Sequence, residues 1–197
     1  MTKSARNGLI AFVAALAIIF GGFAYRQFGA APDETVQAPL SIGGPFRLVD
    51  AGGTDRRDTD FRGKLMLVYF GYTYCPDVCP TTLTTMSDAL ARLGAGASQI
   101  VPIFITVDPA RDTPAQMKQY LASFDPRFVG LTGSPAQIAA AANAYRVYYR
   151  RVSGSGGRYT MDHSSVIYLM ARDGRYLGHF DSTITADDLA RAVKKYL

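Results

Sequence analysis

Cysteine occurs at only two positions in this chain, and both lie in one short segment. Cys75 and Cys79 are separated by three residues within Gly71–Pro80, which reads GYTYCPDVCP. The thiolate is the form of cysteine that attacks disulfides and binds metal ions. A purely structural disulfide over so short a loop would remove little chain entropy, so stability is a weak reason for the pair. The segment therefore predicts either thiol–disulfide exchange or a metal site.

A buried strand and a helix are expected to position the two sulfurs. Leu65–Phe70 and Ile103–Val107 are continuous apolar runs typical of strands buried on both faces. Between them, residues 80–93 repeat apolar side chains at helical spacing. Reactive groups gather beyond the carboxyl ends of parallel strands. Cys75 follows such a strand and Cys79 immediately precedes the helix, whose N-terminus favours a thiolate.

The rest of the chain predicts one α/β domain with a mixed sheet covered by helices on both faces. Two helices begin with a hydroxyl cap, a proline and a glutamine, at Thr113–Gln116 and Ser134–Gln137. A third helix follows a cap at Thr185. Strands are expected at 128–131 and 147–149, and a hairpin at 165–170 and 176–180.

A metal site needs a further ligand, and the chain has two histidines. His163 precedes an apolar strand, in a loop that could face the cysteines, whereas His179 lies inside the predicted hairpin and is disfavoured. Two thiolates and one imidazole suit Cu(I), or Cu(II) if another ligand joins. Zinc would need a fourth ligand and more often uses wider cysteine spacing. Met161 is a candidate soft ligand, and Met86 is expected in the core.

The N-terminal region predicts a membrane anchor. Residues 1–7 carry Lys3 and Arg6, and residues 8–25 are uncharged and long enough to cross a bilayer as a helix. A cleaved signal peptide is the alternative, but its only candidate cleavage site lies before Pro32. The positive charges favour a cytoplasmic N-terminus. Residues 26–43 are interpreted as a linker and 44–197 as the folded domain, on the outer side of a bacterial inner membrane.

The net charge does not indicate a nucleic-acid partner. The formal value is +5, but three positive charges belong to the region before the first acidic residue. The remaining balance is ordinary for a soluble domain. The arginine- and tyrosine-rich segment 146–159 is interpreted as a solvated strand edge, with docking of an acidic partner as the alternative.

The cysteine segment, Val107–Thr113 (VDPARDT) and Asp162–His163 together closely resemble the Sco/SenC family, from about Pro45 to the C-terminus. The resemblance implies a thioredoxin-like, membrane-anchored copper chaperone that is not an enzyme, with an accessory thiol–disulfide reductase activity left open. Its partners would be cytochrome c oxidase subunit II, with its dinuclear copper site, a periplasmic copper donor and a thiol reductant.

The resemblance also implies residue roles. Cys75, Cys79 and His163 would bind copper, and the two cysteines would form a redox-active disulfide. Three carboxylates are expected to lie around the ligands: Asp77, Asp108 and Asp162. Arg111 and Asp112 are interpreted as structural or partner-facing, because carboxylates are poor Cu(I) ligands.

The rival reading is a periplasmic thiol–disulfide oxidoreductase of the same fold. Such enzymes resemble one another in a Cys-x-x-Cys spacing and a late cis-proline, whereas this chain has three intervening residues and no proline after Pro135. A peroxiredoxin-like peroxidase is less consistent still with the context of the cysteines. Copper delivery is therefore preferred.

Overall fold

The computed structural model describes residues 16, 18, 20, 23 and 42–197. The chain forms two separate units, residues 1–40 and 41–197. The predicted cytoplasmic segment, most of the predicted anchor and most of the predicted linker lie outside the described residues. The four isolated residues within the predicted anchor are helical. Among all residues that are described, no helix has the length and apolar character needed to span a bilayer.

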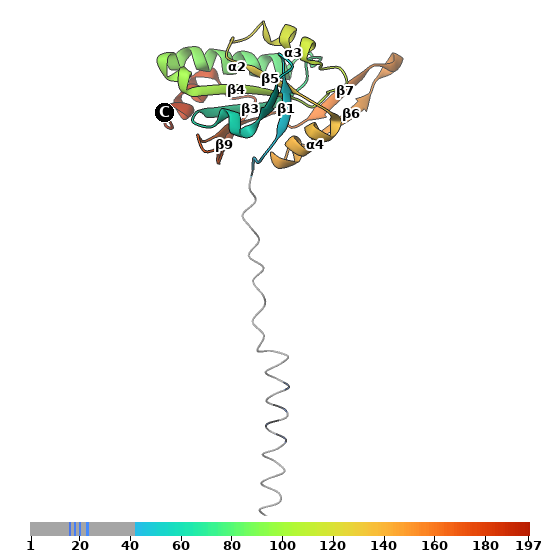
Figure 1. Ribbon diagram of the computed structural model, residues 1–197, viewed down its shortest axis with the longest axis vertical. Coiled ribbons are helices and arrows are strands. Elements are labelled where there is room, and N and C mark those ends of the chain that lie inside the picture. Colours follow the sequence, from blue (N-terminus) through green and yellow to red (C-terminus); the bar gives the residue numbers. More distant parts are fainter. Residues whose placement is uncertain (1–15, 17, 19, 21–22, 24–41) are drawn as a thin grey trace, which may run out of the picture. The chain divides into compact units, whose positions relative to one another are not determined.

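The folded unit is built on a mixed sheet of seven strands in the order β2-β1-β5-β4-β3-β8-β9 (Figure 1). The central strands β3, β4 and β5 run parallel, and β1 and β8 join them in antiparallel fashion. The strands are β1 (Arg47–Asp50), β2 (Asp55–Arg57), β3 (Leu65–Gly71), β4 (Ile100–Thr106), β5 (Val129–Thr132), β8 (Val166–Met170) and β9 (Tyr176–Asp181).

Helices cover both faces of this sheet, as predicted. The α-helices are α2 (Val78–Leu93), α3 (Pro114–Leu121), α4 (Pro135–Ala144) and α5 (Ala186–Lys194). Successive strand residues point to opposite faces, and β3 illustrates the division. Tyr69 contacts Cys79 of α2, while Phe70 packs 5.3 Å, ring to ring, from Tyr145 at the end of α4. The predicted caps Thr113, Ser134 and Thr185 each accept a hydrogen bond from the backbone N–H three residues on.

Short 3-10 helices complete the connections: η1 (Asp58–Phe61), η2 (Gly94–Gln99) and η3 (Ser155–Gly157). Residues 42 and 43, at the end of the predicted linker, already contact the domain, since Gly43 donates to the Ala144 carbonyl at 2.9 Å. All seven residues of β3 are buried. The apolar runs that the sequence assigned to β3 and β4 therefore form the centre of the core.

Three local predictions need correction. Helix α2 begins at Val78, so Cys79 lies in its first turn rather than before it. His163 ends a strand, β7 (Tyr159–His163), rather than lying in a loop. The strand expected at 147–149 begins only at Tyr149, as β6 (Tyr149–Ser153).

Strands β6 and β7 form a separate hairpin that projects from the domain, at the right of Figure 1. The sequence did not predict this pairing, because β6 is mostly exposed and lacks alternating apolar residues. Strand β7 does alternate, with Tyr159 and Met161 more buried than Thr160 and Asp162, and this signal went unused. The β1–β2 hairpin was missed for a similar reason, since β2 consists only of Asp55, Arg56 and Arg57.

Candidate metal centre

The end of β3 and the start of α2 hold the two cysteines close together. The chain turns after Gly71, and the Cys75 N–H donates to the Tyr72 carbonyl at 3.2 Å. The Cys79 N–H then donates to Cys75 Sγ at 3.4 Å. This N–H belongs to the first turn of α2, where backbone donors have no partner within the helix. The helix N-terminus thus points a donor at the Cys75 sulfur.

His163 joins the cysteines from the opposite side. The Sγ atoms of Cys75 and Cys79 and a ring nitrogen of His163 lie within 4.8 Å of one another, the only such group of potential ligands among the described residues. Cys79 Sγ is 3.5 Å from His163 Nε2. His163 Nδ1 is 3.0 Å from the Ser164 carbonyl oxygen. A carbonyl only accepts, so Nδ1 carries the proton and the Nε2 lone pair faces the sulfurs.

The two thiols have opposite acidities. The pKa of Cys75 is lowered to about 4, chiefly because the Cys79 thiol donates to it and backbone N–H groups add further hydrogen bonds, against the opposing effect of burial. The pKa of Cys79 is raised, first because its proton is shared with Cys75 and then by burial. The coupled pair therefore holds one proton at neutral pH, with the negative charge on Cys75.

Aromatic rings enclose the buried side of the site. The Tyr69 hydroxyl donates to Cys79 Sγ at 3.9 Å, and burial raises the pKa of this tyrosine, so it stays a donor. The Tyr69 and Tyr72 rings stand edge-on to the His163 ring, with centroids 6.2 and 5.8 Å away. Sequence reasoning missed these two tyrosines as site residues. Their positions, Tyr69 in β3 and Tyr72 near the start of the cysteine segment, could have indicated that both lie close to the sulfurs.

The site opens to solvent through a cavity of about 500 Å³. Cys75 and His163 line this cavity, whereas Cys79 does not and is fully buried. Met161 is buried and also lines the cavity, between the hairpin and the cysteine loop. The three potential ligands are thus unequal, because an incoming molecule meets Cys75 and His163 before Cys79.

The other residues singled out by the sequence lie at varying distances from this centre. Asp77 caps α2 without a side-chain hydrogen bond and borders the cavity. Asp162 also borders it but is exposed and pairs with Arg150 at 3.7 Å. His179 lies on β9, hydrogen-bonded to Tyr176 and outside the ligand group. Met86 is fully buried in the core, as predicted.

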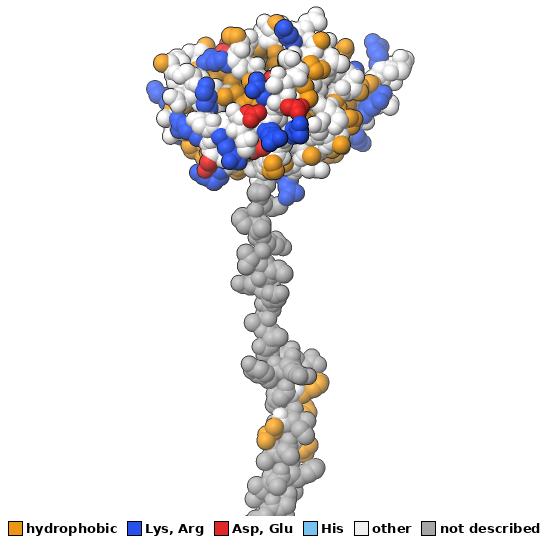
Figure 2. Space-filling view, in the orientation of Figure 1, with side chains coloured by type: hydrophobic (Ala, Val, Ile, Leu, Met, Phe, Trp, Pro, Cys, Tyr) orange, Lys and Arg blue, Asp and Glu red, His pale blue; other side chains and the backbone are white. Residues whose placement is uncertain are grey.

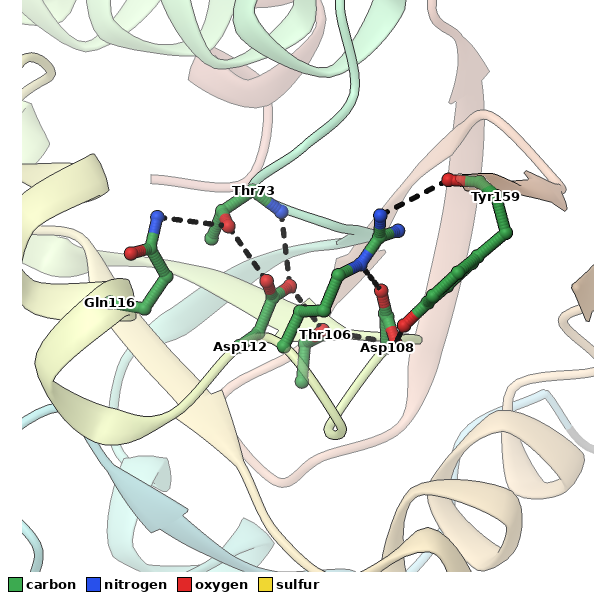
Figure 3. A network of polar contacts seen from close by, with 7 residues as sticks. Thr73, Thr106, Asp108, Asp112, Gln116 and Tyr159 are labelled. Carbon is green, nitrogen blue, oxygen red and sulfur yellow. Dashed lines mark hydrogen bonds and ion pairs between the residues drawn. The ribbon is translucent and has the colours of Figure 1, made fainter. Parts of the chain in front are cut away.

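Asp112 anchors the cysteine segment to the end of β4. Its carboxylate accepts hydrogen bonds from the Thr73 N–H at 3.0 Å, the Thr73 hydroxyl at 2.7 Å and the Thr106 hydroxyl at 2.6 Å (Figure 3). Gln116 donates to the same Thr73 hydroxyl at 3.3 Å. Asp112 is completely buried. The network thus fixes the chain two residues before Cys75.

Asp108 and Arg111 anchor the hairpin that carries His163. Arg111 Nε donates to Asp108, and Arg111 Nη1 donates to the Tyr159 carbonyl at 3.1 Å. The Tyr159 hydroxyl donates to Asp108 at 3.0 Å. The segment 108–112 therefore clamps both halves of the candidate site, the cysteine loop through Asp112 and β7 through Asp108. These contacts are of the structural kind, one of the two roles expected for Arg111 and Asp112, the other being contact with a partner.

Comparison with known proteins places this arrangement in a family. The SCO1/SenC family profile matches residues 34–197. SCO2-like protein RP587 of Rickettsia prowazekii is 41% identical over 157 residues, which cover 79% of this chain and 77% of that protein.

Solved structures extend the likeness to the fold. The copper-bound ScoI of Bradyrhizobium japonicum is 50% identical with a TM-score of 0.75, over 80% of this chain and all of that one. BsSco is described as a member of the Sco family of cytochrome c oxidase assembly proteins with a disulfide switch. It is 26% identical with a TM-score of 0.64, over 83% of this chain and 98% of BsSco. The mixed sheet flanked by helices is thus the thioredoxin-like Sco fold, and this chain belongs to the SCO1/SenC family.

Proposed function

We propose that this protein is a copper chaperone that binds copper through Cys75, Cys79 and His163 and delivers it to the dinuclear copper site of cytochrome c oxidase subunit II. The observation that carries the proposal is the convergence of two sulfurs and one ring nitrogen within 4.8 Å. Sco proteins with copper bound and the assembly role stated for BsSco support it.

The chemistry of the donor set favours copper as the cargo. Thiolates and imidazole are soft and borderline ligands that suit Cu(I), and no carboxylate belongs to the group. The lowered pKa of Cys75 supplies one thiolate before any ion arrives. Copper binding then has only the Cys79 proton to displace. With three protein ligands, a further coordination position remains open. A bound Cu(II) would need a ligand there, and a partner protein could supply one.

The unequal exposure of the two sulfurs supports transfer by stepwise ligand exchange. A ligand of the receiving protein entering the cavity would replace Cys75 or His163 first and the buried Cys79 last. No electron moves in this exchange. Joining Cys75 to Cys79 in a disulfide would instead withdraw both sulfur ligands, so loading requires the reduced pair and a partner thiol as reductant.

We further propose that residues 8–25 anchor the chain in a bacterial inner membrane, with residues 44–197 in the periplasm. The length of the uncharged segment and the preceding positive charges support this placement. The copper donor would then be a periplasmic protein.

The proposal is tested by titrating the protein with Cu(I) in competition with a chromogenic Cu(I) chelator. His163→Ala and Cys75→Ser are expected to lose tight binding while keeping the fold, as judged by circular dichroism. His179→Ala, which changes the one histidine outside the ligand group, should bind like wild type. Full-affinity Cu(I) binding by His163→Ala would refute the three-ligand site. An insulin-reduction assay run in parallel tests the oxidoreductase alternative, which efficient turnover would favour.

A further inference from the structure

A second cavity, of about 630 Å³, lies beside the candidate metal centre. We infer that it is a docking pocket for a carboxylate-bearing segment of the protein that exchanges copper with this one. The inference rests on the proposed function and extends it, by assigning the partner-recognition surface and the chemistry that it recognises.

The position of the cavity suits a partner engaged in metal exchange. Its walls are Tyr74 of the cysteine loop, Arg111 and the tip of the β6–β7 hairpin, residues 154–160. Thr160 lines both this cavity and the one that opens onto Cys75 and His163. A chain segment held in the second cavity would therefore continue toward the cavity that Cys75 and His163 line. A partner docked there could present its own copper ligands close to the candidate metal centre.

The charge of the cavity is complementary to an acidic segment. Arg111 and Arg158 line it, and no carboxylate does. Around it, the hairpin carries Arg150, Arg151 and Arg158 against a single acid, Asp162, which is already paired with Arg150. Basic side chains gather on the projecting hairpin in Figure 2. In the part of the chain that the structure describes, Arg151 and Arg158 form no ion pair, so both charges are free to attract an anion.

Arg111 adds an unmet hydrogen-bonding requirement. Its Nε and Nη1 have acceptors, but its Nη2 is buried and has no partner within the described residues. Leaving a buried charged donor unsatisfied costs free energy that an acceptor would recover. The Tyr74 ring lies over this guanidinium at 4.7 Å and is 54% exposed. An entering carboxylate that displaces this ring reaches the free donor.

The pocket is also rigid enough to recognise a shape. The Arg111 and Arg151 guanidinium carbons each lie 3.7 Å from the centroid of the Tyr159 ring, so the ring must lie between the two cations. Such stacks fix the side chains through cation–π attraction. Arginine and tyrosine are among the residues enriched at binding hot spots. The arrangement is typical of a preformed interface. The sequence alone favoured the other interpretation, a solvated strand edge.

The test measures the second-order rate of Cu(I) transfer from the reduced full chain to the soluble copper-binding domain of oxidase subunit II. Arg158→Glu reverses the exposed charge of the pocket, and Arg158→Gln only removes it. Lys64→Glu is the matched control, since Lys64 is exposed beside the first residue of β3, at the opposite end of that strand from the cysteine loop. Copper affinity is measured for every variant with the competing chelator.

We expect Arg158→Glu to transfer copper about 10-fold more slowly than wild type at roughly 10 mM ionic strength, with Arg158→Gln intermediate. The difference should vanish near 1 M salt, where screening is nearly complete. Copper affinity should be unchanged, and Lys64→Glu should differ from wild type by less than about 2-fold. Equal slowing by Lys64→Glu, or no slowing by Arg158→Glu, overturns the docking pocket while leaving the chaperone function intact.

Two further outcomes separate the remaining explanations. Low inorganic phosphate at fixed ionic strength should inhibit transfer by the wild-type chain by competing with the partner's carboxylate for the pocket, and Arg158→Glu should abolish that inhibition; equal inhibition of wild type and Arg158→Glu would overturn the pocket. A wild-type chain that binds Cu(I) but transfers none to subunit II would overturn the proposed client and this docking role with it.

Discussion

Replacing Gly71 with alanine is the sharpest test of the buried half of the metal centre. A β-carbon at this position would lie 2.8 Å from Cys79 Sγ, 2.8 Å from Phe104 Cε2 and 3.2 Å from Tyr69 Cε1. Unstrained contacts between such atoms need about 3.5–4.0 Å, so the neighbours must retreat by roughly 0.7–1.2 Å. The backbone of Gly71 does not have a positive φ, so the effect is one of space alone.

The magnitude follows from how the two states can relax. Inserting a methyl group into a packed core costs about 1–3 kcal/mol. The copper-free protein can reduce that cost by moving the Cys79 thiol, whereas a bound ion holds the sulfur in place. Most of the strain therefore falls on the copper-bound state. At 1.4 kcal/mol for each factor of ten, Gly71→Ala should weaken Cu(I) binding by about 10- to 100-fold.

The assay is Cu(I) competition against a chromogenic chelator, with urea unfolding of the copper-free protein alongside. Gly178→Ala is the control, because it adds the same methyl group to β9 where no atom lies within 4 Å. We expect Gly178→Ala to bind copper like wild type. Wild-type affinity in Gly71→Ala would refute the reasoning, since it would mean that Cys79 Sγ does not hold copper in the position described.

Two further predictions concern the loop and its chemistry. Asp112→Ala should lower the free energy of unfolding by about 2–4 kcal/mol, because buried donors of Thr73 and Thr106 lose their acceptor. Asp112→Asn keeps one acceptor oxygen and should cost less, and equal stability of the alanine variant and wild type in urea would contradict the anchor. Alkylation of the reduced, copper-free protein by iodoacetamide should modify Cys75 before Cys79. Because the pKa of Cys75 is lowered to about 4, its rate should be nearly constant from pH 6 to 8 and fall only as the pH drops through 4. A rate that keeps rising up to pH 9, as for an ordinary thiol, would show that this thiolate is not stabilised.

The elements that carry the cysteines could be predicted because their signals are local. The run 65–70 is apolar throughout since β3 is buried on both faces, and the caps at Thr113, Ser134 and Thr185 need only the residues that follow them. The two sulfurs are four positions apart, so a strand end and a helix start suffice to bring them together.

The hairpin that brings in His163 left almost no such signal. Strand β6 is mostly exposed and contains two arginines, and β7 is held to the domain by Arg111, 48 residues before Tyr159. Their pairing depends on contacts between distant segments, and periodicity does not report those. The β1–β2 hairpin could not be predicted from the sequence for the same reason.

By itself the sequence determined which atoms are available to a metal: two thiols beside a helix N-terminus and one histidine ahead of a strand. Only the tertiary structure decided that these ligands are unequal. Burial of Cys79 under Tyr69, exposure of Cys75 to a cavity and the fixed tautomer of His163 arise from packing between β3, α2 and β7. The same packing placed Asp112 under the cysteine loop and a basic pocket beside it. Ligand identity is a property of side chains, whereas the order in which a partner meets them depends on which surfaces the fold covers.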